Sequence, residues 1–254
     1  MEIVKKTRFG ISQKLFLMLL VVALVPLFTV WFFNYQSITS LTAQKVNNEL
    51  SAINRNLITY VDTWFDLNER MLLQNAALPS MQSMNGMAQT EILKTITTYY
   101  DWAYLAFTVD SQGNNVARSD GKSLKYYGDR EYFQQVVEGQ KFGRQLLIGK
   151  TSGQPAMVLS TGILGRNGAI DGVLAQAMTL TTLSEKIVNN KIGETGFTFL
   201  VDEKGQVIAH PDAEMTKSRV DLSDHPALAK QQAGQTSIIF VDSYGEKIVA
   251  VAEK

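Results

Sequence analysis

The chain has 254 residues, of which 45% are hydrophobic and 19% charged, and its formal net charge is zero. This length and composition predict one large or two modest packed domains, and they exclude a disordered or collagen-like chain. Because the charge is balanced, we expect no DNA or RNA partner. There is no cysteine and there are only two histidines, so we expect no metal site, no cofactor and no catalytic triad.

The first predicted element is a membrane-spanning helix. An apolar run extends from Leu15 to Phe33 and continues into Tyr35. At about 1.5 Å per residue it nearly spans the roughly 30 Å hydrocarbon core of a bilayer. A cleaved signal peptide is the alternative, but its apolar part usually has only about 7–15 residues. The aromatic residues that end the run are typical of a membrane interface, so an uncleaved transmembrane helix is predicted at residues 15–35.

The charges before this helix predict its orientation. Only Glu2 opposes the basic residues that precede the run, which are Lys5, Lys6, Arg8 and Lys14. Because basic flanks stay on the cytoplasmic side of a membrane, we expect residues 1–14 in the cytoplasm of a bacterium. Everything after about residue 35 is then expected outside the inner membrane, in the periplasm.

Residues 36–79 are predicted to form a long stalk helix. Its apolar positions recur at steps of three and four, the period of an amphipathic helix, at Val46, Leu50, Ile53, Leu57, Val61, Trp64, Leu67 and Met71. This apolar seam is either the coiled-coil interface of a homodimer or the face that packs on the domain below. Pro79 and the serines and methionines after it end or bend the helix, and a second helix is expected at about Gln89–Tyr99.

Two segments of the chain repeat one another at a constant offset of 92 residues (199 − 107 = 92). Residues 107–120 and 199–212 share the pairs Phe107/Phe199, Val109/Val201, Asp110/Asp202, Gly113/Gly205, Ala117/Ala209 and Asp120/Asp212. Each copy is an apolar run, Asp-x-x-Gly and a second apolar run, which is typical of a β-hairpin whose glycine has positive φ. The same offset aligns Gly153 with Gly245 and predicts a second pair of hairpins around them.

Each copy is therefore predicted to be a module of hairpin, short helix and hairpin. The short helices are expected at Glu131–Glu138 and Pro226–Gln232, and a further strand at Ile170–Met178 completes the first module. The predicted fold class is thus α+β, with antiparallel five-stranded sheets and helices on one side. Because Lys254 aligns with Gly162 (254 − 92 = 162), we expect the second module to be truncated. Its last strand, a second membrane helix and a cytoplasmic output domain are expected beyond this sequence.

Two strings of residues carry a resemblance to a known family. They are Tyr-Gly-Asp-Arg-Glu-Tyr-Phe at 127–133 and Ile-Gly-Glu-Thr-Gly-Phe-Thr-Phe at 192–199, the latter followed by Asp-x-x-Gly at 202–205 and Ala-His-Pro at 209–211. With the membrane helix and the stalk, residues 10–254 resemble the double Cache (tandem PAS-like) sensor domains of bacterial chemoreceptors, histidine kinases and diguanylate cyclases. The resemblance implies a membrane-distal, ligand-binding module at 80–185, a membrane-proximal, transmitting module at 186–254, and a homodimer.

The resemblance also implies a ligand site in the distal module, with Arg130 as its anchor. A guanidinium matches a carboxylate with two hydrogen bonds, and aromatic faces enclose the rest of a small ligand. The other candidate ligand-binding residues are Tyr132, Phe133, Tyr127, Asp129, Trp102, Tyr104 and Arg118. Trp102 and Tyr104 are expected to share one face of a strand because they are two residues apart.

Structural alternatives stay open for both arginines. Arg130 stands between Asp129 and Glu131, so it is alternatively a surface residue in an ion pair worth about 0–1 kcal/mol. Arg118 stands two residues before Asp120 on a predicted strand, and the two are alternatively paired with one another at the surface.

The ligand predicted for this site is a small carboxylate or another small polar solute. Amino-acid-binding members of the family carry an aspartate near the end of the last distal strand, where this chain has Ala177. Without that carboxylate, a buried ammonium group would stay unpaired, which is costly. Tyr132 also stands where those members favour tryptophan. The sequence therefore favours ligands other than α-amino acids.

The predicted function is small-molecule sensing outside the membrane by a chemotaxis receptor, in which ligand binding shifts the membrane helices. The alternatives are the sensor of a histidine kinase or diguanylate cyclase, and a structural or partner-binding ectodomain without a ligand. An enzyme is not expected, because the sequence offers no base, nucleophile or metal ligands at workable spacing. His210, next to Pro211, is interpreted as a structural residue in preference to a pH sensor.

Overall fold

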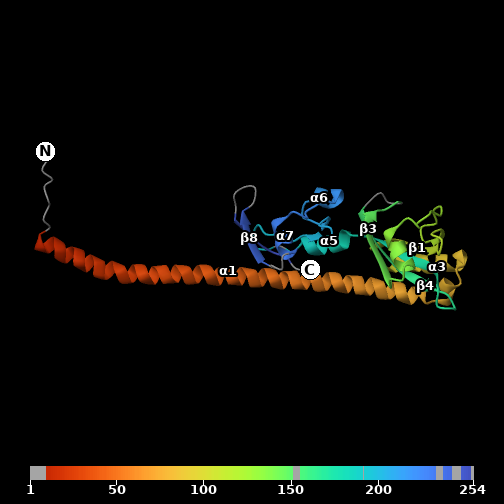
Figure 1. Cartoon of the computed structure of the whole chain (residues 1–254), viewed down its shortest axis with the longest axis horizontal. Helices are drawn as coiled ribbons and strands as arrows, with labels where there is room; N and C mark the ends of the chain where they lie inside the picture. Colours follow the sequence, from red (N-terminus) through yellow and green to blue (C-terminus); the bar gives the residue numbers. More distant parts are fainter. Residues whose placement is uncertain (1–9, 151–154, 191, 233–236, 242–246, 253–254) are drawn as a thin grey trace. The chain divides into compact units, whose positions relative to one another are not determined.

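The computed structural model describes residues 10–150, 155–190, 192–232, 237–241 and 247–252 (Figure 1). The chain divides into two compact units, residues 1–52 and 53–254. The helix α1 (Ile11–Ala76) passes through both units. Within the first unit, the 25 residues Ile11–Tyr35 are helical and, by length and composition, apolar enough to cross a membrane. None of their most apolar stretch is buried, unlike the core helix of a soluble domain.

The second unit begins with the last part of α1, which buries one face against a β-sheet. Trp64, Met71 and Leu72 are buried in the same core as residues of that sheet, whereas Leu67 is 50% exposed. Leu57 and Val61 pack against this core as well. In this unit the apolar seam of the stalk is therefore mostly a packing surface of its own domain, and the homodimer stays a prediction.

The distal module follows α1 with three helices and five strands. Asn85 begins the longest of these helices, because its side-chain oxygen accepts hydrogen bonds from the backbone N–H groups of Met87 and Ala88 at 3.0 and 3.2 Å; such a cap satisfies groups that a helix start leaves unpaired. The elements are α2 (Pro79–Gln82), α3 (Gly86–Tyr99), β1 (Ala103–Asp110), β2 (Asn115–Arg118), α4 (Glu131–Val137), β3 (Phe142–Ile148), β4 (Pro155–Leu164) and β5 (Ile170–Thr179).

The strands of the distal module form one sheet in the order β2-β1-β5-β4-β3. All neighbouring strands are antiparallel, so the predicted five-stranded antiparallel sheet is confirmed. The last strand in sequence, β5, lies at the centre of the sheet. Alternate residues of β1 point to opposite faces: Phe107 belongs to one core cluster and Ala106 to the other, as the period of two in a strand requires.

Helices cover both faces of this sheet, and the expectation of helices on one side was wrong. α1 and α3 contribute Leu72 and Leu93 to the core on one face. α4 contributes Tyr132, Phe133 and Val136 to the core on the other face. The physical reason lies in β4 and β5, which are apolar on both faces, and such strands need cover on both.

The repeated Asp-x-x-Gly turns are confirmed in both modules. Asp110 Oδ1 accepts from the N–H groups of Gln112 and Asn114 at 3.0 and 2.8 Å, and Gly113 has φ of +89°. In the second copy, Asp202 Oδ1 accepts from Lys204 and Gln206 at 2.9 Å each, and Gly205 has φ of +79°. The turns predicted around Gly153 and Gly245 lie outside the described residues.

The described residues after β5, most of which belong to the proximal module, form three short helices and four strands. These strands form two separate two-stranded sheets, β6-β7 and β8-β9. The helix predicted at Pro226–Gln232 is present at those residues. The elements are α5 (Thr181–Val188), β6 (Leu200–Val201), β7 (Val207–Ala209), α6 (Ala213–Ser218), α7 (Pro226–Gln232), β8 (Ser237–Val241) and β9 (Lys247–Val251).

Candidate ligand-binding site

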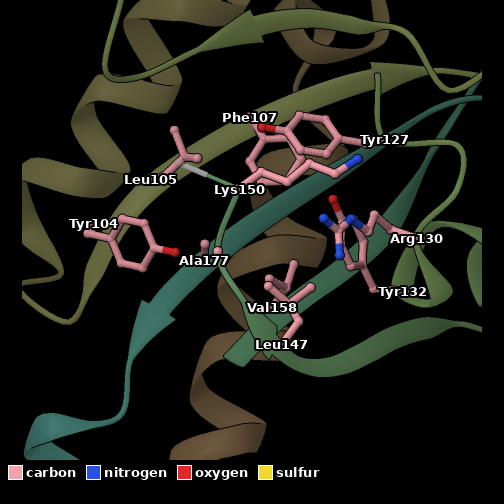
Figure 2. A pocket seen from close by; sticks show the side chains of 11 residues that line it. Tyr104, Leu105, Phe107, Tyr127, Arg130, Tyr132, Leu147, Lys150, Val158 and Ala177 are labelled. Atoms are coloured by element: carbon pink, nitrogen blue, oxygen red, sulfur yellow. The ribbon is translucent and has the colours of Figure 1, made fainter. Parts of the chain in front are cut away.

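A small cavity lies on the α4 face of the distal sheet (Figure 2). Its volume of about 20 Å³ is room for about one water molecule. Side chains from β1, α4 and the β3–β4 hairpin converge on it, with one residue from the central strand β5. The lining residues are Tyr104, Leu105, Phe107, Tyr127, Arg130, Tyr132, Leu147, Gly149, Lys150, Val158 and Ala177.

Arg130 brings a partly exposed guanidinium to this cavity. The residue precedes α4, in extended conformation, and its side chain makes no cap hydrogen bond to the helix. Its Nε lies 3.9 Å from Asp129 Oδ2, and the side chain is 21% exposed. At that distance the contact is a loose ion pair and not a bidentate one. Within the described residues, the guanidinium therefore lies at the cavity and forms no bidentate pair with a carboxylate.

Lys150 is the second cation at the cavity, and its charge is already paired. Its Nζ lies 3.0 Å from both carboxylate oxygens of Asp129 and donates to the carbonyl of Tyr126 at 3.2 Å. The ammonium also lies 5.7 Å from the centre of the Tyr127 ring. Figure 2 shows the nitrogen ends of Lys150 and Arg130 on the same side of the cavity. Burial opposes the charge of Asp129, but Lys150 and then Arg130 outweigh it and lower the pKa of this carboxyl.

The aromatic walls of the cavity come from three strongly buried rings. The rings of Phe107 and Tyr127 are 4.7 Å apart, and those of Phe107 and Tyr132 are 6.2 Å apart at a nearly perpendicular angle. Tyr132 is 1% exposed, and burial raises the pKa of its phenol, so the group stays neutral. These walls offer apolar faces with hydroxyl groups and no negative charge.

Arg118 holds one of these walls in place and does not line the cavity. It makes a bidentate ion pair with Asp120, with both N–O distances at 2.8 Å, and donates from Nη1 to the Tyr127 hydroxyl at 2.6 Å. The predicted pairing with Asp120 is therefore present, but it is buried instead of at the surface, because the Arg118 side chain is 1% exposed. The hydrogen bond from Arg118 lowers the pKa of Asp120 in spite of burial.

The other candidate residues differ in their position relative to the cavity. Tyr104 lines the cavity. Asp129 does not line it, but it accepts a hydrogen bond from Lys150, which does. Phe133 is buried in the core beside it. Trp102 lies on the opposite face, where its Nε1 donates to Asn68 of α1 at 2.9 Å. It does not share a face with Tyr104, because the register of β1 on β5 shifts between Ala103 and Leu105.

Several lining residues were not among the predicted site residues. Gly149 and Lys150 directly follow β3, and the apolar Leu105, Phe107, Leu147 and Val158 lie on strands. A strand pattern marks such residues as core, and only their convergence in space shows that they line a cavity. Ala177, for which the resemblance implied a place in the site, does line the cavity. None of the described residues that line it is acidic.

The strand that carries Ala177 also contacts α1 on its other face. Gln176 donates from Nε2 to Asn68 Oδ1 at 2.8 Å, and both residues are fully buried. Asn68 Oδ1 also accepts from Trp102, and its amide nitrogen donates to the carbonyl of Trp64 at 2.7 Å. Two successive residues of β5 thus connect the cavity with the long helix.

The fold and the repeated hairpins are those of a tandem PAS-like protein. Two modules that repeat the same Asp-x-x-Gly hairpin follow a long helix, and the first is a five-stranded antiparallel sheet with a cavity on one face. The chain belongs to the double Cache family, because the family model dCache_1, described as a Cache domain, matches residues 34–253. No curated protein is detectably similar to the whole chain.

Solved structures of bacterial sensor domains share this fold. The ligand-binding domain of the Pseudomonas fluorescens chemoreceptor CtaA, in complex with L-serine, has a TM-score of 0.67 at 15% identity, covering 81% of this chain and 88% of that one. That of the Campylobacter jejuni chemoreceptor Tlp3, with L-valine, has a TM-score of 0.64 at 17% identity, covering 83% and 88%. The Vibrio cholerae histidine kinase DctB sensor domain has a TM-score of 0.55 at 16% identity, covering 68% and 69%.

Proposed function

We propose that this chain is the extracytoplasmic sensor of a bacterial membrane receptor and that it binds a small carboxylate in the distal cavity. The observation that carries the proposal is the charge of the cavity. Arg130 and Lys150 line it, and no acidic residue does so within the described part of the chain. Asp129 neutralises Lys150, so one uncompensated positive charge is left, which matches one carboxylate.

The single positive charge at the cavity disfavours an α-amino acid as the ligand. Its carboxylate would pair with Arg130, but its ammonium would enter a cavity whose β5 wall is Ala177 and whose other walls are aromatic, aliphatic or basic. An ammonium left without an anion in such a site is strongly disfavoured. The chemoreceptor domains of similar fold are described with bound L-serine and L-valine, and we infer that this chain differs from them in ligand class.

Ligand binding requires the cavity to open. Its volume of about 20 Å³ is too small for a ligand larger than about one water molecule. The side chains of Arg130 and Lys150 are 21% and 32% exposed, so they border on solvent, and the proposed opening is an outward rotation of these two side chains. A ligand that binds only the opened arrangement of the cavity shifts the equilibrium from the closed arrangement to the opened one. Such a shift is the thermodynamic requirement for a signal.

The proposed output route runs through β5. An opening of the cavity that moves Ala177 also moves its neighbour Gln176, which is hydrogen-bonded to Asn68 of α1. The apolar helix Ile11–Tyr35 at the other end of α1 is the proposed membrane anchor, with residues after about 35 in the periplasm. A chemotaxis receptor is the proposed setting, and a histidine kinase is the second candidate because the DctB sensor domain has the same fold.

The proposal predicts that carboxylates stabilise the protein through Arg130. We expect acetate, propionate, lactate or pyruvate at millimolar concentration to raise the Tm of the 254-residue chain in nanodiscs. Arg130→Ala is expected to weaken that ligand about 10- to 100-fold, because a hydrogen bond to a charged group is worth about 1.5–3 kcal/mol. Arg166→Ala is the matched control, since Arg166 is exposed on the β4–β5 turn.

The second arm of this experiment tests ligand class. Ala177→Asp is expected to create a response to α-amino acids such as L-alanine, because it supplies the missing carboxylate at the cavity wall. If wild-type protein responded to amino acids and not to the carboxylates, the proposed ligand class would be wrong. If Arg130→Ala kept the full response, the proposed site would be wrong.

A further inference from the structure

The only two histidines of the chain lie against the same aromatic ring in the proximal module. The centre of the Phe199 ring is 6.0 Å from that of His210 and 5.5 Å from that of His225. Phe197 packs edge-on against His210 at 5.3 Å. Both histidines are partly buried. The sequence does not indicate that the two histidines lie close together in space, because they are fifteen positions apart (225 − 210 = 15).

Both imidazoles accept a hydrogen bond at Nδ1 from the backbone N–H two residues ahead. His210 Nδ1 accepts from Asp212 at 3.0 Å, and His225 Nδ1 accepts from Ala227 at 3.2 Å. A ring nitrogen that accepts a hydrogen bond carries no proton, so this geometry favours neutral side chains with their proton on Nε2. A protonated imidazole has a donor at both nitrogens, and these two contacts then become repulsive.

Each of these two hydrogen bonds lies at the start of a helix: that of His210 at α6 and that of His225 at α7. Asp212 begins α6 by accepting at its side chain from Glu214 N at 2.9 Å. His225 begins α7, because its carbonyl accepts from Leu228 and Ala229 at 2.9 and 3.0 Å while its ring accepts from Ala227. N–H groups at a helix start carry partial positive charge. A positive imidazole is therefore disfavoured at both places.

We propose that His210 and His225 make the proximal module an acid-sensitive element of the receptor. In this mechanism, protonation at Nδ1 breaks both hydrogen bonds and loosens the turns that hold Phe199. The consequence reaches beyond the turns, because Phe199 lines a groove with residues of α1, among them Leu57 and Val61. The inference is independent of the distal cavity and needs no ligand.

Charge and burial around the two rings set the direction of the pH effect. Burial lowers the pKa of His225 and of His210 below the ordinary value of 6.5. The Asp212 carboxylate, and to a smaller extent a backbone hydrogen bond of the same residue, raise the pKa of His210 without overcoming the effect of burial. The remaining carboxylates of these turns, Glu214 and Asp224, are exposed and strongly screened.

The sign of the stability change follows from these pKa values. A histidine whose pKa is lower in the folded than in the unfolded state takes up its proton first in the unfolded state. The stabilisation is therefore fully present above about pH 6.5, and it is lost as the pH falls from there toward the folded-state pKa. At neutral pH both Nδ1 hydrogen bonds are expected to stay intact. At mildly acidic pH they are expected to break, which lowers the stability of the proximal module.

NMR of the 254-residue chain, labelled at histidine with ¹⁵N and ¹³C in nanodiscs, tests the starting state directly. With only two histidines, each resonance can be assigned from one variant. We expect both rings to be Nε2–H tautomers at pH 7.5 and to titrate below pH 6.5. A proton on Nδ1, or a titration at or above pH 6.5 for both rings, would overturn the proposal.

The double variant His210→Asn/His225→Asn tests the consequence. Asparagine places an oxygen where Nδ1 stands, so it can accept the same N–H, as asparagine does at helix starts, but it does not titrate. We expect the wild-type Tm to fall by several degrees between pH 7.5 and 5.5, because the unfolded state takes up protons on both histidines before the folded state does. The double variant is expected to lose most of that fall. An unchanged fall contradicts the proposal, and if the variant does not fold, the NMR titration of the wild type decides.

Discussion

At the scale of single residues, burial and the nearest partner decide the different roles of Arg118 and Arg130. Arg118 and Arg130 both stand close to an aspartate in the sequence. Arg118 is buried and held by Asp120 in two short hydrogen bonds, whereas Arg130 is partly exposed and 3.9 Å from Asp129. The Nε and Nη2 groups of Arg118, which would form a bidentate pair with a ligand carboxylate, are already bonded to Asp120, whereas Arg130 forms no bidentate pair with Asp129.

Removing the partner of Arg118 is expected to destabilise the fold strongly. Asp120→Ala leaves a buried guanidinium without its carboxylate and should lower the free energy of unfolding by about 3–5 kcal/mol. Asp66→Ala is the matched control, because its ion pair with Arg70 is exposed, at 58% and 78% of the two side chains, and is worth about 0–1 kcal/mol. Urea denaturation measures both. Equal small losses would mean that the buried pair contributes no more than a surface one.

At the scale of elements, the hairpin turns are the parts that the sequence predicted most closely. The pattern Asp-x-x-Gly implies both an acceptor side chain and a residue with positive φ, and the structure has both in each copy. The packing of these turns was not predicted. A Cβ atom on Gly113 would meet the backbone of Gly128 at 2.5 Å, and one on Gly205 would meet that of Ser223 at 2.7 Å.

These contacts predict that equal substitutions at glycines of similar φ have unequal costs. Gly168→Ala should cost about 1 kcal/mol, because φ is +79° but nothing lies within 4 Å of the new methyl group. Gly113→Ala adds a backbone clash at φ of +89° and should cost at least about 2–3 kcal/mol. Thermal denaturation of the two variants checks the order. If the two variants were equally stable, the close approach at Gly128 would have no energetic weight.

At the scale of the whole second unit, one buried asparagine joins the sheet to the long helix. Asn68 is fully buried, and its Oδ1 accepts from both Trp102 and Gln176. One acceptor of α1 therefore holds a side chain of β5 and the side chain just before β1, and Gln176 Nε2 also donates to Met178 Sδ at 3.1 Å. Such a buried network specifies how the two elements pack, because an unpaired polar group in it is costly.

Asn68→Leu is expected to lower the free energy of unfolding by about 2–4 kcal/mol, because the buried Gln176 and the partly buried Trp102 lose an acceptor. Asn75→Leu is the control: that side chain is only partly buried and donates a single bond, to the carbonyl of Met71, so a smaller loss is expected. Hydrogen exchange of the β5 amides should accelerate in Asn68→Leu and much less in Asn75→Leu. Unchanged exchange in both would show that the sheet does not depend on this contact.

The sequence by itself determined the elements and their repetition, because these depend on local chemistry. The apolar period of a helix and the Asp-x-x-Gly pattern of a turn both act within a few residues. Tertiary structure alone decided which face of the distal sheet carries the cavity, that Trp102 lies away from it and that Lys150 reaches it. A register shift in β1 and helices on both faces of the sheet caused these differences. Such features arise from packing between distant segments, and no local pattern records them.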